Sequence, residues 1–186
     1  MIRRQAFAAV RVLLVFTVLL GVLYPLAVTG IAGVAMPGRA GGSLVRSGGE
    51  VVGSSLIGQE FAGPEWFHGR PDPFDPAASG ATNLGPSNER LALTVRLAAA
   101  AVARREGTVG SIPADAVTGS GSGLDPHISP EYARLQVPRV AAARGLGQSE
   151  VLALVDGLTE GRTLGFLGEP RVNVLLLNLA LATLRP

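Results

Sequence analysis

The feature that most constrains this chain is an uncharged, apolar run near its N-terminus, from residue 12 to residue 36. As an α-helix it would extend about 37 Å at 1.5 Å per residue, and the hydrocarbon core of a bilayer is about 30 Å thick. A cleaved signal peptide also starts with basic residues, but its apolar core is about half as long. We therefore expect an uncleaved membrane-spanning helix over residues 12–36.

Charge is spread unevenly on the two sides of this run. Arg3, Arg4 and Arg11 precede it, and only Arg39 and Arg46 follow it closely. Basic residues are enriched on the cytoplasmic flank of membrane helices. We therefore expect a single-pass protein of the cell inner (plasma) membrane, with residues 1–11 in the cytoplasm and the rest of the chain extracytoplasmic.

The composition of the remaining chain excludes several classes of function. All 14 acidic residues lie after residue 36, together with 13 of the 16 basic residues, so this part is close to neutral. A nucleic-acid-binding domain would carry a basic surface instead. With 0 Cys and no Lys, the chain offers no disulfide, thiolate metal site, Schiff-base lysine or Walker lysine.

Turn-forming residues divide the chain after the membrane run. Residues 37–49 are rich in Gly, Ser and Arg and are typical of a juxtamembrane linker, and residues 50–186 are expected to form one domain. One or two short strands fit residues 50–61. The density of Gly, Pro, Ser and Asn in residues 62–86 leaves no long regular element.

Capping residues and apolar periodicity predict the helices of this domain. In chain order, we expect them to begin at Ser87 or Asn88 and end near Arg105, to begin at Ser129 and end at Gly145 with a break at Pro138, to begin at Ser149, and to follow Pro170. The predicted fold is a single N-terminal transmembrane α-helix plus one soluble α+β domain with long Gly/Pro-rich loops.

Small residues in the membrane run indicate a helix-packing face. Gly21, Gly30 and Gly33 would let a neighbouring membrane helix approach closely. Pro25 can bend a membrane helix and still be tolerated. These four residues are the predicted membrane-packing positions.

Two loops carry residues that resemble catalytic or metal-binding groups. Asp125, His127 and Ser129 offer an acid, an imidazole and a hydroxyl, but a hydrolytic triad normally draws these from distant segments, and Ser129 suits a helix cap better. His68 and His127 are the 2 histidines, and their spacing matches no known ligand pattern. Residues 119–123 alternate Gly and Ser but lack the lysine of a phosphate loop. We expect no catalytic residue, no metal site and no cofactor held by the chain itself.

The same loops, with other segments, resemble one protein family. The matching segments run in order along nearly the whole chain, and each is unusual in composition: residues 23–26, 52–59, 67–71 (FHGRP), 79–80, 83–88 (NLGPSN), 117–118, 120–129 (SGSGLDPHIS), 168–175 (GEPRVNVL) and 177–181. They resemble the C subunit of the Kdp-type potassium-transporting ATPase. The departures are loop changes: Ala81-Thr82 stands where Gly-Ser is expected, Gly119 where Ala is expected, and Phe74-Asp75 where Tyr-Asn is expected.

The resemblance implies a set of partners. It places the chain in a complex with a channel-like potassium-binding subunit, a P-type pump subunit and a small single-span subunit. Such a complex uses ATP, Mg and potassium ions and imports potassium at very low external concentration. The resemblance further implies that the C subunit supports assembly and acts as a catalytic chaperone that raises the ATP affinity of the pump subunit.

We therefore predict a non-catalytic accessory subunit whose outer domain caps the potassium entrance. The predicted partner-contact residues are polar side chains of the two loops and the matching motifs: His68, Arg70, Asn83, Asn88, Ser120, Ser122, Asp125, His127, Glu169, Arg171 and Asn173. Two alternatives stay open at this point. One is a membrane-anchored periplasmic enzyme or binding protein, and the other is direct nucleotide binding by the domain, which would require the opposite topology.

Overall fold

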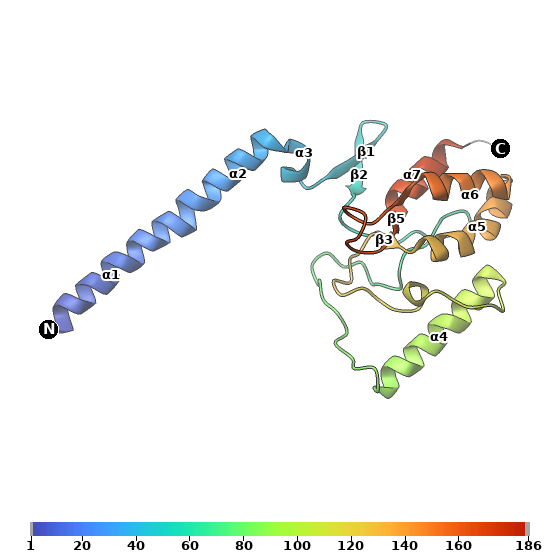
Figure 1. Cartoon of the computed structure of the whole chain (residues 1–186), viewed down its shortest axis with the longest axis horizontal. Helices are drawn as coiled ribbons and strands as arrows, with labels where there is room; N and C mark the ends of the chain where they lie inside the picture. The colour runs from blue at the N-terminus through green and yellow to red at the C-terminus, as the bar shows by residue number, and fades with distance from the viewer. Residues whose placement is uncertain (1, 185–186) are drawn as a thin grey trace. The chain divides into compact units, whose positions relative to one another are not determined.

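The computed structural model describes residues 2–184, which divide into two compact units, one up to Leu44 and one from Val45. The first unit is dominated by one long helix (Figure 1), in which α1 (Ile2–Val18), the π-helical segment η1 (Leu19–Leu23) and α2 (Tyr24–Ala35) follow one another without a break. This helix has 34 residues and a window of mean hydropathy 2.5 that is 0% buried. It is long and apolar enough to cross a bilayer, and the helix extends to Ile2, beyond the uncharged run of residues 12–36.

The membrane helix widens just before Pro25 instead of breaking there. Proline has no N–H to donate and its ring crowds the carbonyl group four residues earlier. A π-helical turn relieves this by bonding five residues back, and the N–H of Tyr24 donates to the carbonyl oxygen of Leu19. The helix is also exposed along its glycines, since a Cβ added at Gly30 or Gly33 would meet nothing within 4 Å.

Residues 37–49, predicted to be a linker, contain regular structure. They hold the short helix α3 (Pro37–Ala40) and strand β1 (Leu44–Ser47), which pairs with β2 (Glu50–Ser54). The connecting Gly48 and Gly49 have φ values of 59° and 90°. Two successive residues with positive φ form the tight turn that a two-residue hairpin requires, so these two glycines close a hairpin.

Capping residues set the ends of the helices in the second unit. The side chain of Asn88 accepts a hydrogen bond from the N–H of Arg90 at the start of α4 (Glu89–Glu106), which ends at Gly107 with φ 64°. The Ser129 side chain does the same for Tyr132 at the start of α5 (Pro130–Arg144). The predicted starts of these two helices are therefore confirmed.

The remaining helices differ slightly from the prediction. The helix predicted from Ser149 is α6 (Gln148–Gly157), which begins one residue earlier. The last helix is α7 (Val174–Thr183). A strand, β5 (Arg171–Asn173), lies between Pro170 and this helix.

The predicted break of α5 at Pro138 is wrong. The helix continues through this residue, although proline cannot donate to the carbonyl group of Arg134. Pro138 is exposed, whereas Val137 and Val140 on either side are buried. Burial of the inner face outweighs the loss of one solvent-facing hydrogen bond, since tertiary packing supplies most helix stability.

A small antiparallel sheet, which the sequence did not predict, joins the helices. Its strand order is β3 (His127–Ile128), β5 and β4 (Thr159–Glu160), with Val172 of β5 opposite both Ile128 and Thr159. Two-residue strands lack the alternation that a sequence pattern needs. The only other regular segment between α4 and β3 in the described chain is the 3₁₀ turn η2 (Ala114–Ala116).

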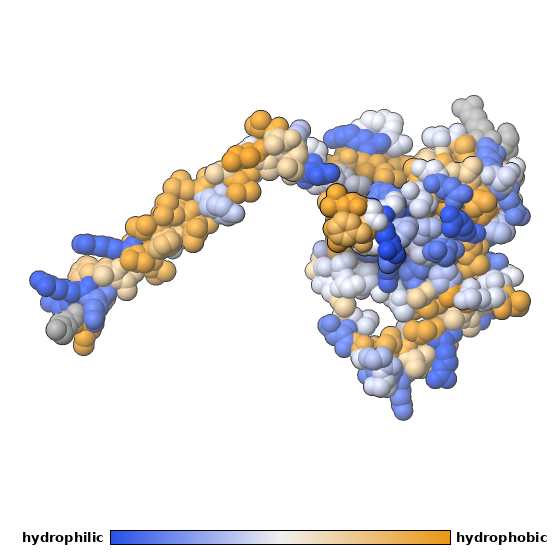
Figure 2. Space-filling model, viewed as in Figure 1, coloured by the Kyte–Doolittle hydropathy of each residue, from blue (hydrophilic) through white to orange (hydrophobic). Residues whose placement is uncertain are grey.

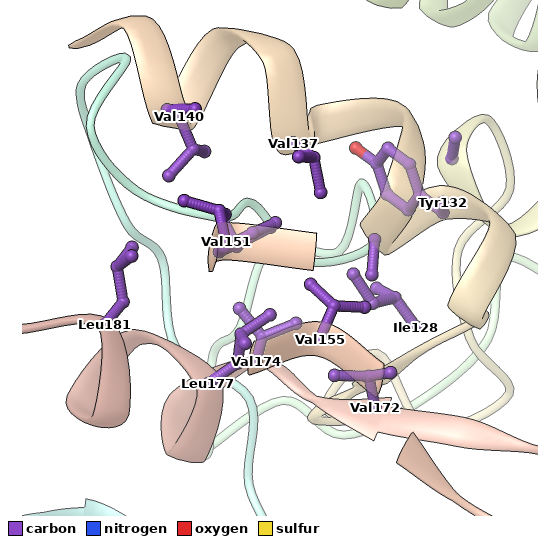
Figure 3. Close-up of a cluster of buried hydrophobic side chains, with 14 of the residues drawn as sticks. Ile128, Tyr132, Val137, Val140, Val151, Val155, Val172, Val174, Leu177 and Leu181 are labelled. Atoms are coloured by element: carbon purple, nitrogen blue, oxygen red, sulfur yellow. The ribbon is translucent and has the colours of Figure 1, made fainter. Parts of the chain in front are cut away.

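The core of the second unit lies where α5, α6, α7 and the sheet meet (Figure 3). The side chains that fill it are Ile128, Tyr132, Val137, Val140, Val151, Val155, Val172, Val174, Leu177 and Leu181, all at most 5% exposed. The inward faces of the last two helices carry Val151 and Val155 of α6 and Leu177 and Leu181 of α7, all 0% exposed. Between β2 and α4, residues 55–88 form neither helix nor strand.

Candidate functional site

The irregular segment of residues 64–68, here called the pinned segment, is held by side chains of two core helices. The Asn178 side chain of α7 accepts from the N–H of Phe67 and donates to its carbonyl oxygen, both at 2.9 Å. Gln136 of α5 does the same for His68, at 2.8 and 3.0 Å. Both amide side chains are at most 1% exposed. Buried backbone groups require hydrogen-bond partners, and these two amides supply the donors and acceptors that a neighbouring strand would otherwise provide.

Two arginines of α5 hold the rest of the pinned segment. Arg139 donates to the carbonyl oxygens of Pro64 and Trp66, at 2.6 and 2.9 Å. Arg144 donates to the carbonyl oxygen of Glu65 and lies 4.4 Å from the centre of the Trp66 ring. Such an arrangement combines hydrogen bonding with a cation–π contact, so α5 holds every residue of the segment except Phe67, which α7 holds.

A buried carboxylate completes this network. The side chain of Glu106, 0% exposed, accepts from Nε of Arg139 at 2.9 Å and from Nε of Arg105 at 2.7 Å. Arg105 also donates to the hydroxyl of Tyr132 at 2.8 Å. Burial raises the pKa of Tyr132, although the positive charge of Arg105 opposes the shift. The end of α4 is thereby tied to α5.

The two loops that carry the family resemblance lie against each other. Arg70 donates to the carbonyl oxygen of Gly119 at 2.9 Å, and the carboxylate of Asp72 accepts from the N–H of Ser120 at 2.8 Å. A Cβ added at Gly119 would lie 2.6 Å from that carboxylate. At this position the family resemblance leads us to expect Ala, and an alanine here would require the Asp72 side chain to shift.

A second set of contacts lies further along the same loops. The N–H of Gly80 and the hydroxyl of Ser79 both donate to the carbonyl oxygen of Ser122, at 2.8 and 3.1 Å. Gly58 donates to the carbonyl oxygen of Leu124 at 2.8 Å. The structure thus brings together Arg70, Ser120 and Ser122, which lie in two separate stretches of the sequence.

Asp125 and His127 form a pair without a nucleophile. Nδ1 of His127 lies 2.9 Å from Oδ1 of Asp125, and this hydrogen bond lowers the pKa of Asp125, with a smaller contribution from the charge of Arg70. Ser129 is not part of the pair, because its hydroxyl donates to Asp115 and accepts from the N–H of Tyr132. A hydrolytic triad requires the serine to face the imidazole.

A groove of about 330 Å³ opens beside the first loop. Its lining includes His68, Arg70, Asp72, Phe74, Arg105 and Tyr132. Nε of Arg70 is buried and has no hydrogen-bond partner among residues 2–184. Burial lowers the pKa of His68, whose Nε2 lies 2.9 Å from the carbonyl oxygen of Gly63. Since a carbonyl only accepts, that nitrogen carries the hydrogen.

The other predicted contact residues fall into two groups. Asn83 is exposed, whereas Asn173 is only 4% exposed: it donates to the carbonyl oxygen of Ser55 and caps α7. Glu169 and Arg171 are exposed, and each forms an ion pair, Glu169 with Arg162 and Arg171 with Glu160. Asn173 therefore has a structural role and offers almost no surface.

Four residues that organise the site were missed from the sequence: Gln136, Arg139, Arg144 and Asn178. A signal existed for the last of these. Asn178 interrupts an otherwise apolar helix on its inward side, and buried polar side chains are bonded to something. The sequence does not say to what, because the partner lies 111 residues away. Within the described part of the chain, no three His, Asp or Glu side chains gather as a metal site would require.

The geometry defines a class of protein: a small domain joined to one apolar helix, with a built polar surface and, in the residues described, no assembled catalytic group. Comparison with known proteins makes this specific. A family model described as the K+-transporting ATPase c chain, KdpC, matches residues 6–183. The chain belongs to this family, which confirms the resemblance drawn from the loop motifs.

Individual relatives agree over almost their whole length. The chain is 57% identical over 171 residues to the potassium-transporting ATPase KdpC subunit of Caulobacter vibrioides, covering 89% of this chain and 86% of the relative. It is 55% identical to that of Kineococcus radiotolerans, covering 98% and 95%, and 52% identical to that of Geobacter sulfurreducens, covering 96% and 97%.

Proposed function

We propose that this chain is the non-catalytic accessory subunit of a high-affinity, ATP-driven potassium import complex. Its partners in this proposal are a channel-like potassium-binding subunit, a P-type pump subunit and a small single-span subunit. The names of the relatives and the family model support the potassium-transporting ATPase. The membrane helix docks on the membrane subunits, and the domain contacts them from outside the cytoplasm.

The extracytoplasmic location follows from the charges beside the helix. Arg3, Arg4 and Arg11 lie on its N-terminal side within the first turns, and basic residues favour the cytoplasmic flank. A domain on the outer side has no access to cytoplasmic ATP. Its effect on the ATP affinity of the pump subunit is therefore a coupling transmitted through the membrane subunits, not a direct contact.

The observation that carries the proposed contact surface is the environment of Arg70. This side chain lies where the two resemblance loops meet, on the wall of the 330 Å³ groove. Its Nε lacks a partner within the described residues, and a buried donor without an acceptor is costly. A carboxylate or carbonyl group of a partner subunit entering the groove would satisfy it.

Substitution of Arg70 tests this surface. We expect Arg70→Ala to lower the yield of co-purified complex or to raise the potassium concentration for half-maximal ATPase activity, by about tenfold for an anchor residue of an interface. His127→Ala, which removes the partner of Asp125, should have a smaller effect in the same direction.

Arg134→Ala is the matched control, because Arg134 is an exposed arginine whose ion pair with Asp156 lies away from the groove. If Arg70→Ala and His127→Ala both leave yield and potassium affinity at the level of this control, the two loops are not the contact surface.

A further inference from the structure

A loop of the second unit exposes large apolar side chains at its tip. Residues 161–170 join β4 to β5, and Leu164, Phe166 and Leu167 are 79%, 68% and 49% exposed. Figure 2 shows an orange protrusion where Figure 1 draws this loop in dark red. Single exposed apolar residues need no explanation, but a cluster of them marks a contact site.

The tip is a turn held by backbone hydrogen bonds. The N–H of Thr163 and that of Leu167 each donate to the carbonyl oxygen of the other residue at 2.9 Å, and Gly165 and Phe166 also donate to carbonyl groups within the loop. Leu164 has φ 55°, a left-handed conformation that strains a leucine. The turn thus holds apolar side chains outward while four of its N–H groups are paired within the loop, which lowers the cost of an apolar surrounding.

The base of this loop lies at the end of the domain where the chain enters it. The hairpin of β1 and β2 is antiparallel because its turn has two residues, so Val45 lies beside the end of β2. That end is fixed against β5, since the carbonyl oxygen of Ser55 accepts from Asn173. The loop joins β5 at Arg171, about 7 Å along the strand from Asn173. Leu56, next to this contact, is itself 62% exposed.

A short segment tethers this end of the domain to the apolar helix. Residues 36–43 separate the end of α2 from β1, and eight residues span at most about 28 Å. An anchored segment reaches a nearby surface at a high effective concentration, so even a few apolar side chains suffice to hold it there. The charged residues at the loop base, Arg162 paired with Glu169 and Arg171 paired with Glu160, match the polar headgroup level.

We propose that residues 163–167 form a lipid-contacting tip that enters the headgroup–acyl boundary of the bilayer and orients the domain on its anchor. The proposal requires the apolar helix to span the membrane. It does not depend on the contacts of the two resemblance loops with partner subunits, so either can fail alone.

The absence of cysteine in the chain permits a direct test. The full chain carrying Phe166→Cys is reconstituted into phospholipid vesicles and labelled with a nitroxide. Relaxation is measured with oxygen, which concentrates in the bilayer, and with a water-soluble nickel chelate. We expect oxygen to relax the label several-fold more effectively than the chelate. Leu97→Cys, at an apolar position on α4 that is 63% exposed against 68% for Phe166, is the control and should show the reverse.

Two outcomes overturn the proposal. A label at residue 166 that responds like the control places the tip in water. If the label is reached by oxygen in vesicles of the chain alone but by neither reagent in the purified complex, the tip lies against a protein partner. Leu164→Cys, at the other side of the tip, repeats the measurement in case one substitution disturbs the turn.

Discussion

The helical core and the pinned segment (residues 64–68), of which only Phe67 is fully buried, are held in different ways. Val151, Val155 and Leu177 in the core touch apolar neighbours and need no particular direction. The pinned segment is irregular backbone, and its carbonyl oxygens and the N–H groups of Phe67 and His68 bond to side chains, chiefly those of Gln136 and Asn178. The difference indicates that a polar side chain inside an apolar helix marks where that helix holds a loop.

Removal of Asn178 should separate the two regions most clearly. Asn178→Ala leaves the buried N–H and carbonyl group of Phe67 without partners, which we expect to cost about 3 kcal/mol of unfolding free energy. Chemical unfolding of the full chain in detergent is followed by circular dichroism, for the helices, and by fluorescence of Trp66, the 1 tryptophan of the chain. The Trp66 transition should move to lower denaturant than the helix transition.

Leu177→Ala is the neighbouring control. It removes core packing and should cost a similar amount, about 3 kcal/mol, but it should lower both transitions together. If Asn178→Ala also lowers both signals in parallel, the pinned segment is part of the core and the distinction between the two regions does not hold.

The pinned segment should also respond to pH in a way that the core does not. Burial lowers the pKa of His68 below the value of 6.5 that it has when unfolded. Below that pH the unfolded chain binds a proton that the folded chain resists, so the unfolding free energy should fall as pH decreases from neutrality and stay flat above it. Unfolding measured at a series of pH values, with Trp66 as the probe, checks the slope.

His68→Gln separates this residue from the other titrating groups. A glutamine can still donate to the carbonyl oxygen of Gly63 but does not titrate. The variant should therefore lose the part of the slope that lies between neutral pH and mildly acidic pH. An unchanged slope would assign the acid sensitivity to another group, such as the Asp125 carboxylate at lower pH.

The same contrast explains what the sequence could predict. Cap residues such as Asn88 and Ser129 act on backbone groups two or three residues away, and the stripe of α6 repeats within one helix, so local patterns reveal them. The pinned segment and the sheet depend on partners far along the chain, such as the pairing of His127 with Asn173. The family resemblance located the two loops, but only the structure shows that Arg70 joins them.

The smallest predicted effect concerns Pro138, which lies between Gln136 and Arg139, two of the three α5 residues that hold the pinned segment. It is exposed, and its ring denies the carbonyl group of Arg134 a helical partner. Pro138→Ala restores that bond but frees the unfolded chain, so we expect a net gain of about 1 kcal/mol in unfolding free energy, seen equally by Trp66 fluorescence and circular dichroism.

Pro130→Ala should give no such gain, because a proline at the first helical position costs nothing. If Pro138→Ala instead lowers the Trp66 transition alone, then the proline sets the local geometry of α5 that aims Gln136 and Arg139 at the loop. The helix would in that case be shaped by the segment that it holds.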